Sequence, residues 1–214
     1  MALSKVNFNS LNLTPTASKT VVFNSNNNGI EAGDVGGSLV LISEQTASSS
    51  STISFTSGID STYKEYIFKF INIHPGHSSY TDFLFNMSAD SGSNYNVTKT
   101  TTYFSAISFE NGSYADKEYN TSLDTAQGTG FQTLTDNTGN GNDQCLSGTL
   151  HLFDPSSTTF VKHFKSRISN AENQSAIDTF VAGYGNTTSA VDAVQFKFLS
   201  GNIDSGTIKL YGVS

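Results

Sequence analysis

Two of the four histidines lie close together in the sequence, and histidine is a common metal ligand and acid–base group. The run His74-Pro75-Gly76-His77 could bring two imidazoles together across a turn, with Asp82 as the nearest plausible carboxylate. A metal site would need at least one or two further ligands. We therefore expect a turn with exposed imidazoles and no metal, although the sequence alone leaves ion binding by His74 and His77 open.

A glycine- and asparagine-rich loop, Asp136–Asp143, is a second candidate for ion binding. Residues 138–143 are similar to one turn of a calcium-binding repeat, but a single copy lacks the stacked neighbouring turns that complete such sites. Aligned as an EF-hand loop from Asp136, the segment has Ser147 where the bidentate glutamate should stand. We expect an ordinary surface loop and no cofactor, and here too the sequence does not decide.

Enzyme catalysis usually needs two or more reactive side chains that lie close together. No motif in this sequence places such side chains next to each other. The carboxylates available for glycoside hydrolysis are Asp60, Glu65, Asp82, Glu110, Asp178 and Asp192. Cys145 has only His151 as an obvious base, and a cysteine at the start of a strand is usually a small core residue. No serine lies in a nucleophile elbow. We predict no catalytic residue and a protein that is not an enzyme.

Several tyrosines could offer flat faces for sugar rings, although the chain has no tryptophan, usually the strongest sugar platform. They are Tyr66, Tyr80, Tyr103, Tyr114, Tyr184 and Tyr211. A carbohydrate-binding module is therefore one alternative function.

Short apolar, aromatic-rich segments separated by Gly, Asn, Asp and Ser must position these residues, and they predict strands. The candidates include Ser38–Glu44, Lys64–His74, Asp82–Ser88, Gly148–Phe153, Thr158–Arg167, Asp192–Ser200 and Thr207–Val213. In Lys64–His74, the side chains of Tyr66, Phe68 and Phe70 alternate with those of Ile67, Ile71 and Ile73, which predicts a central strand covered on both faces. About ten strands predict an all-β fold, a jelly-roll-like β-sandwich.

Two segments could instead be short helices, Asn96–Phe104 and Ala171–Phe180. Neither carries the apolar i, i+3, i+4 stripe of a core helix. The first is rich in threonine, which favours extended or turn structure.

The N-terminal part of the chain differs from the rest. Residues 1–36 hold two short apolar patches, Leu11–Leu13 and Val21–Phe23, which bury too little surface to offset their own ordering entropy. We predict an extended N-terminal arm over residues 1–44 that attaches to a partner, and a β-sandwich domain over residues 51–214.

The charge of the chain argues against two classes of binding partner. The net charge is −7, only 14% of residues are charged, and the 11 Lys and Arg residues are scattered along the sequence. Binding to a phosphate backbone needs clustered cations, so we expect neither nucleic acid nor an anionic membrane as a partner. The first residues also lack the apolar core of a signal peptide.

Several segments together resemble structural proteins of marine bacteriophages, especially tail-fibre-like proteins of cyanophages. They are Asn9–Lys19, Ile53–Tyr63, Tyr66–Pro75, Leu150–His163, Tyr184–Ala190 and Gly206–Val213. The match is one of pattern across nearly the whole chain, without a catalytic or cofactor signature.

The resemblance implies a non-enzymatic virion component made in the host cytoplasm. It implies a β-sandwich protomer in a homotrimer that contacts other virion proteins through the arm and attaches to a host surface glycan or receptor. The chain lacks heptads, collagen-like triplets and a repeat shaft, so a short fibre or tip fits better than a long fibre. Capsid decoration and a head fibre remain alternatives.

Overall fold

The computed structural model describes residues 19–23, 30–34 and 38–214, and these residues form only strands, turns and loops. Contacts divide the chain into a small unit, residues 1–38 with Ser214, and a compact unit, Leu39–Val213. The strands are β1 (Lys19–Phe23), β2 (Ile30–Asp34), β3 (Leu39–Thr46), β4 (Ile53–Phe55), β5 (Glu65–Pro75), β6 (Thr81–Ser88), β7 (Lys99–Phe109), β8 (Ala115–Tyr119), β9 (Gln132–Thr138), β10 (Leu146–Phe153), β11 (Lys162–Glu172), β12 (Ser175–Gly185), β13 (Ala193–Phe198) and β14 (Ile203–Val213).

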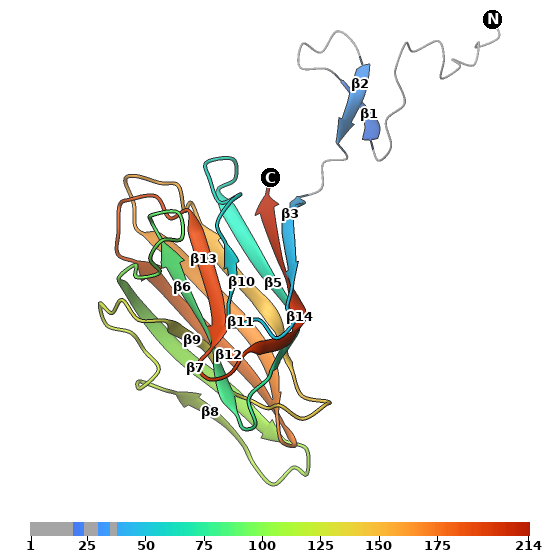
Figure 1. Ribbon diagram of the computed structural model, residues 1–214, viewed down its shortest axis with the longest axis vertical. Coiled ribbons are helices and arrows are strands. Elements are labelled where there is room, and N and C mark those ends of the chain that lie inside the picture. Colours follow the sequence, from blue (N-terminus) through green and yellow to red (C-terminus); the bar gives the residue numbers. More distant parts are fainter. Residues whose placement is uncertain (1–18, 24–29, 35–37) are drawn as a thin grey trace, which may run out of the picture. The chain divides into compact units, whose positions relative to one another are not determined.

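The compact unit is a sandwich of two antiparallel sheets (Figure 1). The larger sheet has eight strands in the order β3-β14-β5-β10-β11-β12-β7-β8, and the smaller has four in the order β4-β13-β6-β9. The predicted all-β sandwich is confirmed, with twelve strands where the sequence suggested about ten.

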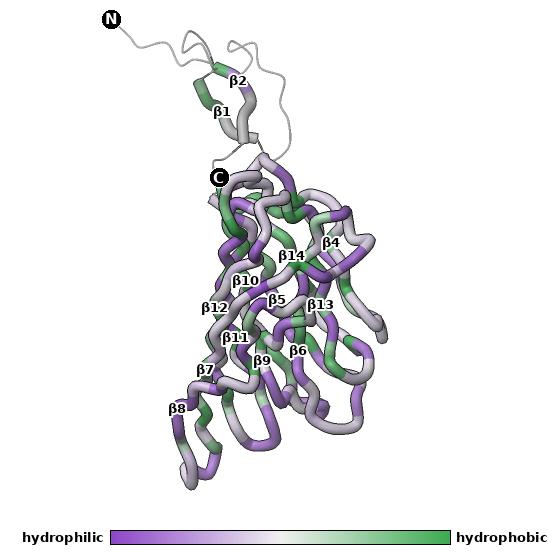
Figure 2. Tube along the Cα trace, turned by 90° about the vertical axis from the view of Figure 1, so that its left-hand side faces the viewer, coloured by the Kyte–Doolittle hydropathy of each residue, from purple (hydrophilic) through white to green (hydrophobic). Residues whose placement is uncertain are grey.

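Aromatic side chains fill the space between the sheets. Phe196 of β13 lies at the centre, with ring centroids 5.2 Å from Phe68, 5.1 Å from Phe70 and 5.9 Å from Phe83. Green and purple segments alternate along the strands in Figure 2, as expected for sheets that are buried on one face. Eight of the sixteen phenylalanines thus lie in the buried core of a chain of only modest hydrophobic content.

The central strand β5 contains a bulge at Asn72. Both neighbouring strands shift register there, and Asn72 has a φ of 50°. The extra residue turns Ile73 inward, so it is fully buried, whereas Ile67 and Ile71 stay half-exposed on the other face. The prediction that β5 is covered on both faces is therefore wrong: the narrower sheet covers one face of the wider sheet, and no described strand covers the other.

Neither segment considered as a short helix is one, and the expectation that Asn96–Phe104 is extended is confirmed for its residues 99–104. Residues 99–104 belong to β7, and residues 171–180 span the end of β11, a two-residue turn and the start of β12. In that turn Asn173 and Gln174 both have positive φ, which closes the hairpin tightly. Cross-strand pairing determines that these segments are strands, because β12 pairs with both β11 and β7 over its whole length.

The N-terminal unit contains the hairpin of β1 and β2, in which Phe23 pairs with Ile30. Val21 and Phe23 are 46% and 76% exposed. The patch Leu11–Leu13 lies outside the described residues. Residues 39–44 of the predicted arm are part of β3, because the backbone of this strand hydrogen-bonds to β14. The attachment role of the arm stays a prediction.

Candidate functional site

The face of the eight-stranded sheet that points away from the smaller sheet carries an unusual group of side chains, and we call it the outer face. Strand alternation sends the core residues inward and every second residue to this face. On the four adjacent strands β10, β11, β12 and β7 the outer face presents Thr149, His151, Phe153, His163, Lys165, Arg167, Asp178, Phe180, Ala182, Tyr184, Thr100, Thr102 and Phe104.

Two phenylalanines form an aromatic stack on this face. Phe180 of β12 is directly opposite Phe104 of β7, and their rings are stacked with centroids 4.9 Å apart and planes only 4° from parallel. Parallel rings at this distance overlap, so each ring covers one face of the other. Phe104 is 45% exposed, so the stack can offer a ligand mainly the exposed part of Phe104.

Arg167 lies next to the phenylalanine pair, and its guanidinium carbon is 4.8 Å from the Phe180 ring centroid. Asp178 accepts two hydrogen bonds from it, one from Nε at 3.1 Å and one from Nη2 at 2.7 Å. These hydrogen bonds and the carboxylate charge raise the pKa of Arg167. The bidentate pair orients a permanent positive charge beside the aromatic surface.

Lys165 is a second cationic group on this face. It is the next outward-facing residue of β11 after Arg167. Lys165 Nζ is 5.4 Å from the ring centroid of Phe153, and Lys165 is opposite His151 in the sheet. His151 Nδ1 is 2.6 Å from Glu65 Oε1. Lys165 is exposed and takes part in no ion pair within the described residues.

The outer face is hollowed between these groups. A cavity of about 390 Å³ is lined by Phe104, Thr149, His151, Lys165, Arg167, Phe180 and Ala182, among others. A neighbouring cavity of about 310 Å³ is lined by Thr100, Thr102, His163, Ala182 and Tyr184, among others. Ala182 lines both hollows, so they lie side by side on the outer face, and we call the two together the groove.

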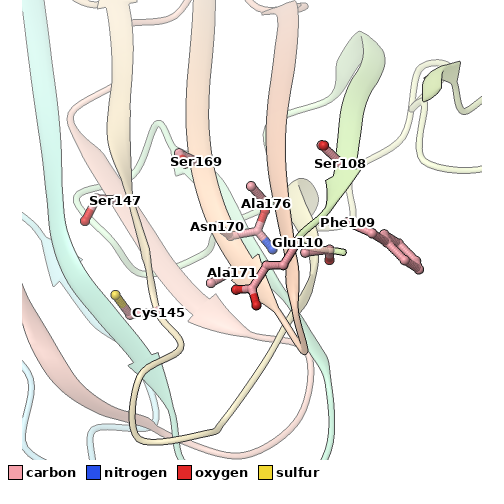
Figure 3. A pocket seen from close by; sticks show the side chains of 10 residues that line it. Ser108, Phe109, Glu110, Cys145, Ser147, Ser169, Asn170, Ala171 and Ala176 are labelled. Atoms are coloured by element: carbon pink, nitrogen blue, oxygen red, sulfur yellow. The ribbon is translucent and has the colours of Figure 1, made fainter. Parts of the chain in front are cut away.

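A third cavity, of about 610 Å³, opens near the other end of these strands (Figure 3). It is lined by Ser108, Phe109, Glu110, Cys145, Ser147, Ser169, Asn170, Ala171, Ser175 and Ala176. Cys145 is half-buried here and is not part of the hydrophobic core, so that part of the prediction is wrong; the next residue, Leu146, takes the inward position. Burial raises the pKa of the Cys145 thiol, which disfavours the nucleophilic thiolate.

The histidines predicted as a possible metal pair make separate contacts. His74 Nε2 is 3.3 Å from the carbonyl oxygen of Gly141, whereas His77 Nδ1 is 3.3 Å from that of Ser79. Asp82 accepts a hydrogen bond from the Asn137 amide at 3.3 Å, and burial together with the charge of Asp136 raises its pKa. Within the residues that the structure describes, no group of three or more His, Cys, Asp or Glu could hold a metal ion.

The loop predicted at Asp136–Asp143 is shorter in the structure. Asp136 and Thr138 belong to β9, and Asp136 Oδ1 accepts a hydrogen bond from the Tyr103 hydroxyl at 2.7 Å. The remaining turn is closed by Gln144, whose Oε1 accepts a hydrogen bond from the Gly141 amide at 3.0 Å. Asp136 and Gln144 thus bind groups of the chain itself.

Most of the carboxylates considered for hydrolysis also have structural partners. Glu65 and Asp178 contact His151 and Arg167, as described above. Asp60 accepts a hydrogen bond from the Thr62 amide at 2.8 Å, which lowers its pKa. Asp192 binds the amide of Ser91 at 2.9 Å. Glu110 lies apart from these groups, at the third cavity.

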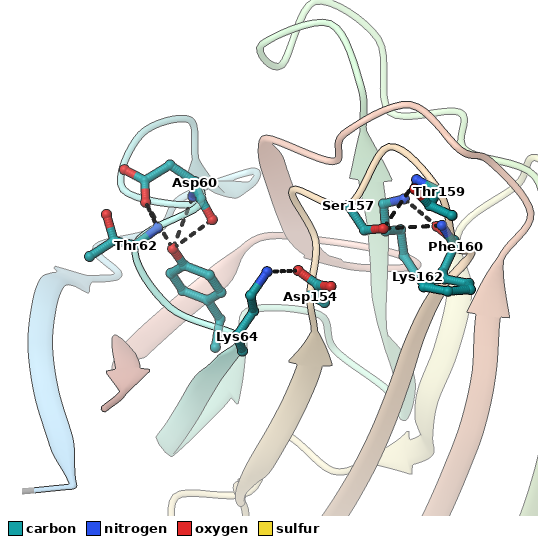
Figure 4. Close-up of polar contacts among 9 residues, drawn as sticks. Asp60, Thr62, Lys64, Asp154, Ser157, Thr159, Phe160 and Lys162 are labelled. Atoms are coloured by element: carbon teal, nitrogen blue, oxygen red, sulfur yellow. Dashed lines mark hydrogen bonds and ion pairs between the residues drawn. The ribbon is translucent and has the colours of Figure 1, made fainter.

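Short polar contacts also fix the loops beside β5 and β10 (Figure 4). Lys64 Nζ is 2.9 Å from Asp154 Oδ1, and Ser157 Oγ accepts a hydrogen bond from the Phe160 amide at 3.0 Å. Lys162 is fully buried, and its Nζ donates to the carbonyl of Phe160 at 2.6 Å. These groups hold loops in place and are therefore not free for chemistry.

The tyrosines divide into two groups. Tyr66 and Tyr103 are fully buried, so the prediction that they offer sugar-stacking faces is wrong. Tyr184 and Tyr211 are half-exposed on the outer face, and Tyr80 and Tyr114 are exposed elsewhere.

Phe104, Phe180 and Arg167, the main residues of the outer face, were not predicted as site residues. In the structure Thr100, Thr102 and Phe104 alternate with buried Thr101 and Tyr103, but the run of three threonines followed by two aromatic residues shows no such alternation in the sequence.

This chain matches no protein-family model, no curated protein sequence and no solved structure. In the part of the chain that the structure describes, no helix is long and apolar enough to cross a membrane.

Proposed function

We propose that this protein is a non-enzymatic structural component of a bacteriophage particle, a tail fibre or short fibre tip that takes part in host attachment. The observation that carries the proposal is the division of the chain into a small N-terminal unit and a compact sandwich. A two-stranded hairpin is marginally stable by itself, and the β1–β2 hairpin exposes Val21 and Phe23. Such a hairpin suits a segment that docks on another protein.

The sandwich supports the other half of the proposal, the display of a binding surface. Its outer face is broad and carries aromatic and cationic groups that the core does not use. Most of the carboxylates and histidines considered as catalytic groups contact one another or the backbone. This favours a role in binding over a role as an enzyme. The resemblance to marine phage fibre proteins agrees with both halves.

The test is the composition of particles from a phage that encodes this chain. Mass spectrometry of purified particles should detect the chain, and antibodies against the sandwich should label the tail or its fibres. Particles that lack the chain would contradict the proposal. Labelling of the head would instead support the alternative of a capsid decoration or head-fibre protein.

The second candidate function is a stand-alone carbohydrate-binding module, and the exposed Phe104–Phe180 pair favours it. This function requires no particle and no oligomer. Light scattering separates the two candidates: a fibre protein is expected to be a trimer of the 22.9-kDa chain, and a stand-alone module is expected to be a monomer.

A further inference from the structure

We propose that the groove on the outer face, across β10, β11, β12 and β7, binds an anionic polysaccharide. Lys165 and Arg167 would contact its acidic groups, and the exposed ring of Phe104, backed by Phe180, would contact the apolar faces of its sugar rings. The inference rests on the proposed function, because it assigns the ligand class of the surface that the sandwich displays.

The groove has room for a short stretch of a sugar chain. Its floor is the cross-strand row Thr102–Ala182–Lys165–His151. The row Phe104–Phe180–Arg167–Thr149 lies on one side of this floor. On the other side lies the row Thr100–Tyr184–His163. Since alternate residues of a strand are about 6.7 Å apart, the two side rows lie roughly 13 Å from each other. Four strands spaced by about 4.8 Å give a length of roughly 14 Å.

The charge of the groove indicates an anionic ligand. The whole chain has a net charge of −7, yet the outer face carries Lys209 on β14, Lys69 on β5, and Lys165 and Arg167 on β11. Of the acidic residues around them, Glu44 forms an ion pair with Lys209 and Asp178 with Arg167, and Glu65 contacts His151. Lys69 and Lys165 take part in no ion pair among the described residues. The face therefore keeps unneutralised positive charge on an acidic protein.

The arrangement of the two kinds of group also suits a charged sugar chain. Sugar rings present apolar C–H faces with polar substituents at their edges, so an aromatic surface must lie next to the groups that bind the substituents. Arg167 is held beside Phe180 by Asp178, and it keeps outward-facing N–H groups because its side chain is 66% exposed. Arg167, Phe180 and Phe104 thus follow one another in a cross-strand row, which places the cation and the exposed Phe104 ring near each other.

The smaller sheet offers a closely matched control. Lys197 Nζ lies 4.6 Å from the ring centroid of Phe131, a lysine–phenylalanine contact like that of Lys165 with Phe153. Lys197→Gln removes the same charge as Lys165→Gln, but from the other sheet. Phe131→Ala likewise controls for Phe104→Ala.

The experiment is calorimetric titration of the full chain with three polymers: alginate, which is carboxylated, dextran sulfate, and neutral dextran. We expect at least one of the two anionic polymers to bind, more weakly as salt increases, and dextran not to bind. Lys165→Gln should weaken binding about threefold and Phe104→Ala roughly threefold to tenfold, while Lys197→Gln and Phe131→Ala leave it unchanged. Circular dichroism of each variant verifies the fold.

Four results would overturn the inference: no binding of either anionic polymer, equal binding of dextran, an equal loss in the Lys197→Gln variant, or tighter binding of single-stranded DNA. The outcome is separable from that of the proposed function. Particles that contain the chain, with a protein that binds no anionic polymer, would refute only the groove assignment. Polymer binding by a chain absent from particles would refute only the particle role.

Discussion

At the scale of single residues, two buried lysines show how polar groups serve the fold. Lys99 of β7 and Lys162 of β11 lie on either side of Gly185 in β12, and both side chains are fully buried. Lys99 Nζ donates to the Gly130 carbonyl at 2.6 Å. Burial lowers the pKa of Lys99 to about 8, because no described carboxylate offsets the loss of hydration.

This pKa predicts a dependence of stability on pH. Between pH 8 and 10.5 the unfolded chain binds a proton at Lys99 that the folded chain has lost, so the free energy of unfolding rises with pH in that range. Lys99→Met should remove this rise, which amounts to about 3 kcal/mol at most. Urea denaturation of both proteins from pH 7 to 10 measures it.

Lys117→Met provides the control, because Lys117 is an exposed lysine on β8. Its curve should run parallel to that of the unmodified protein. Parallel curves for the Lys99 variant as well would show that Lys99 is not a buried charge.

Phe196 is the residue on which the core depends most. Its ring contacts those of Phe55, Phe68, Phe70 and Phe83 with centroid distances from 5.1 to 6.4 Å. Phe196→Ala should lower the free energy of unfolding by about 3–5 kcal/mol through the cavity that it leaves. Phe160→Ala, at a side chain that is 69% exposed, should change it by less than about 0.5 kcal/mol. Similar losses in the two variants, measured by urea denaturation, would contradict this packing.

Residue roles were predicted least well from the sequence. Tyr66 and Tyr103 are as aromatic as the exposed tyrosines, and only the strand register shows that their rings point inward to Asp60 and Asp136. The pairing of Arg167 with Asp178 depends in the same way on which strands are neighbours. Patterns within a short stretch of sequence do not show which strands are neighbours or which residues face each other.

At the scale of elements, the bulge in β5 depends on the strand beside it. Gly206 of β14 has a φ of 111°, and a Cβ there would lie 2.4 Å from the carbonyl oxygen of Asn72. Gly206→Ala should therefore lower the free energy of unfolding by about 3 kcal/mol, since both a strained φ and a backbone collision oppose it.

Gly112→Ala separates these two causes. Gly112 also has a positive φ, of 70°, but a Cβ there meets nothing within 4 Å, so the loss should be only about 1 kcal/mol. Equal losses in guanidinium denaturation would mean that the close approach to Asn72 does not matter.

Strands were predicted better than residue roles, because burial on one face leaves a period of two in the sequence. Lys64–His74 and Thr207–Val213 were located within a few residues of β5 and β14. The pattern failed where the pairing of strands, and not the periodicity, determines the structure. The extra residue at Asn72 turns the side chain of Ile73 to the buried face. The threonine-rich start of β7 has few apolar residues that could show an alternation.

At the scale of the whole molecule, the two-sheet architecture matters most. Each sheet of a sandwich covers only one face of the other, so the outer face of the eight-stranded sheet is not covered by any described strand and can contact a partner or ligand. Neither the order of the strands nor their division between sheets could be predicted from the sequence, because both arise from contacts between distant segments.

The N-terminal unit should be dispensable for folding but not for assembly. All members of the buried core lie between Ala47 and Leu210, so a variant beginning at Ser38 should unfold within about 2 °C of the full chain in scanning calorimetry. It should also fail to enter particles. A large loss of stability, or normal incorporation, would contradict the attachment role of this unit.

The central claim is that this chain is a surface component of a phage particle, anchored by its N-terminal unit and displaying its sandwich. A density map of the intact particle tests it most directly. The account predicts that the sandwich of eight and four strands fits density on the tail or its fibres, with residues 1–38 against another virion protein and the outer face towards solvent. A map in which no density fits the sandwich, or in which the outer face is buried against the particle, would contradict it.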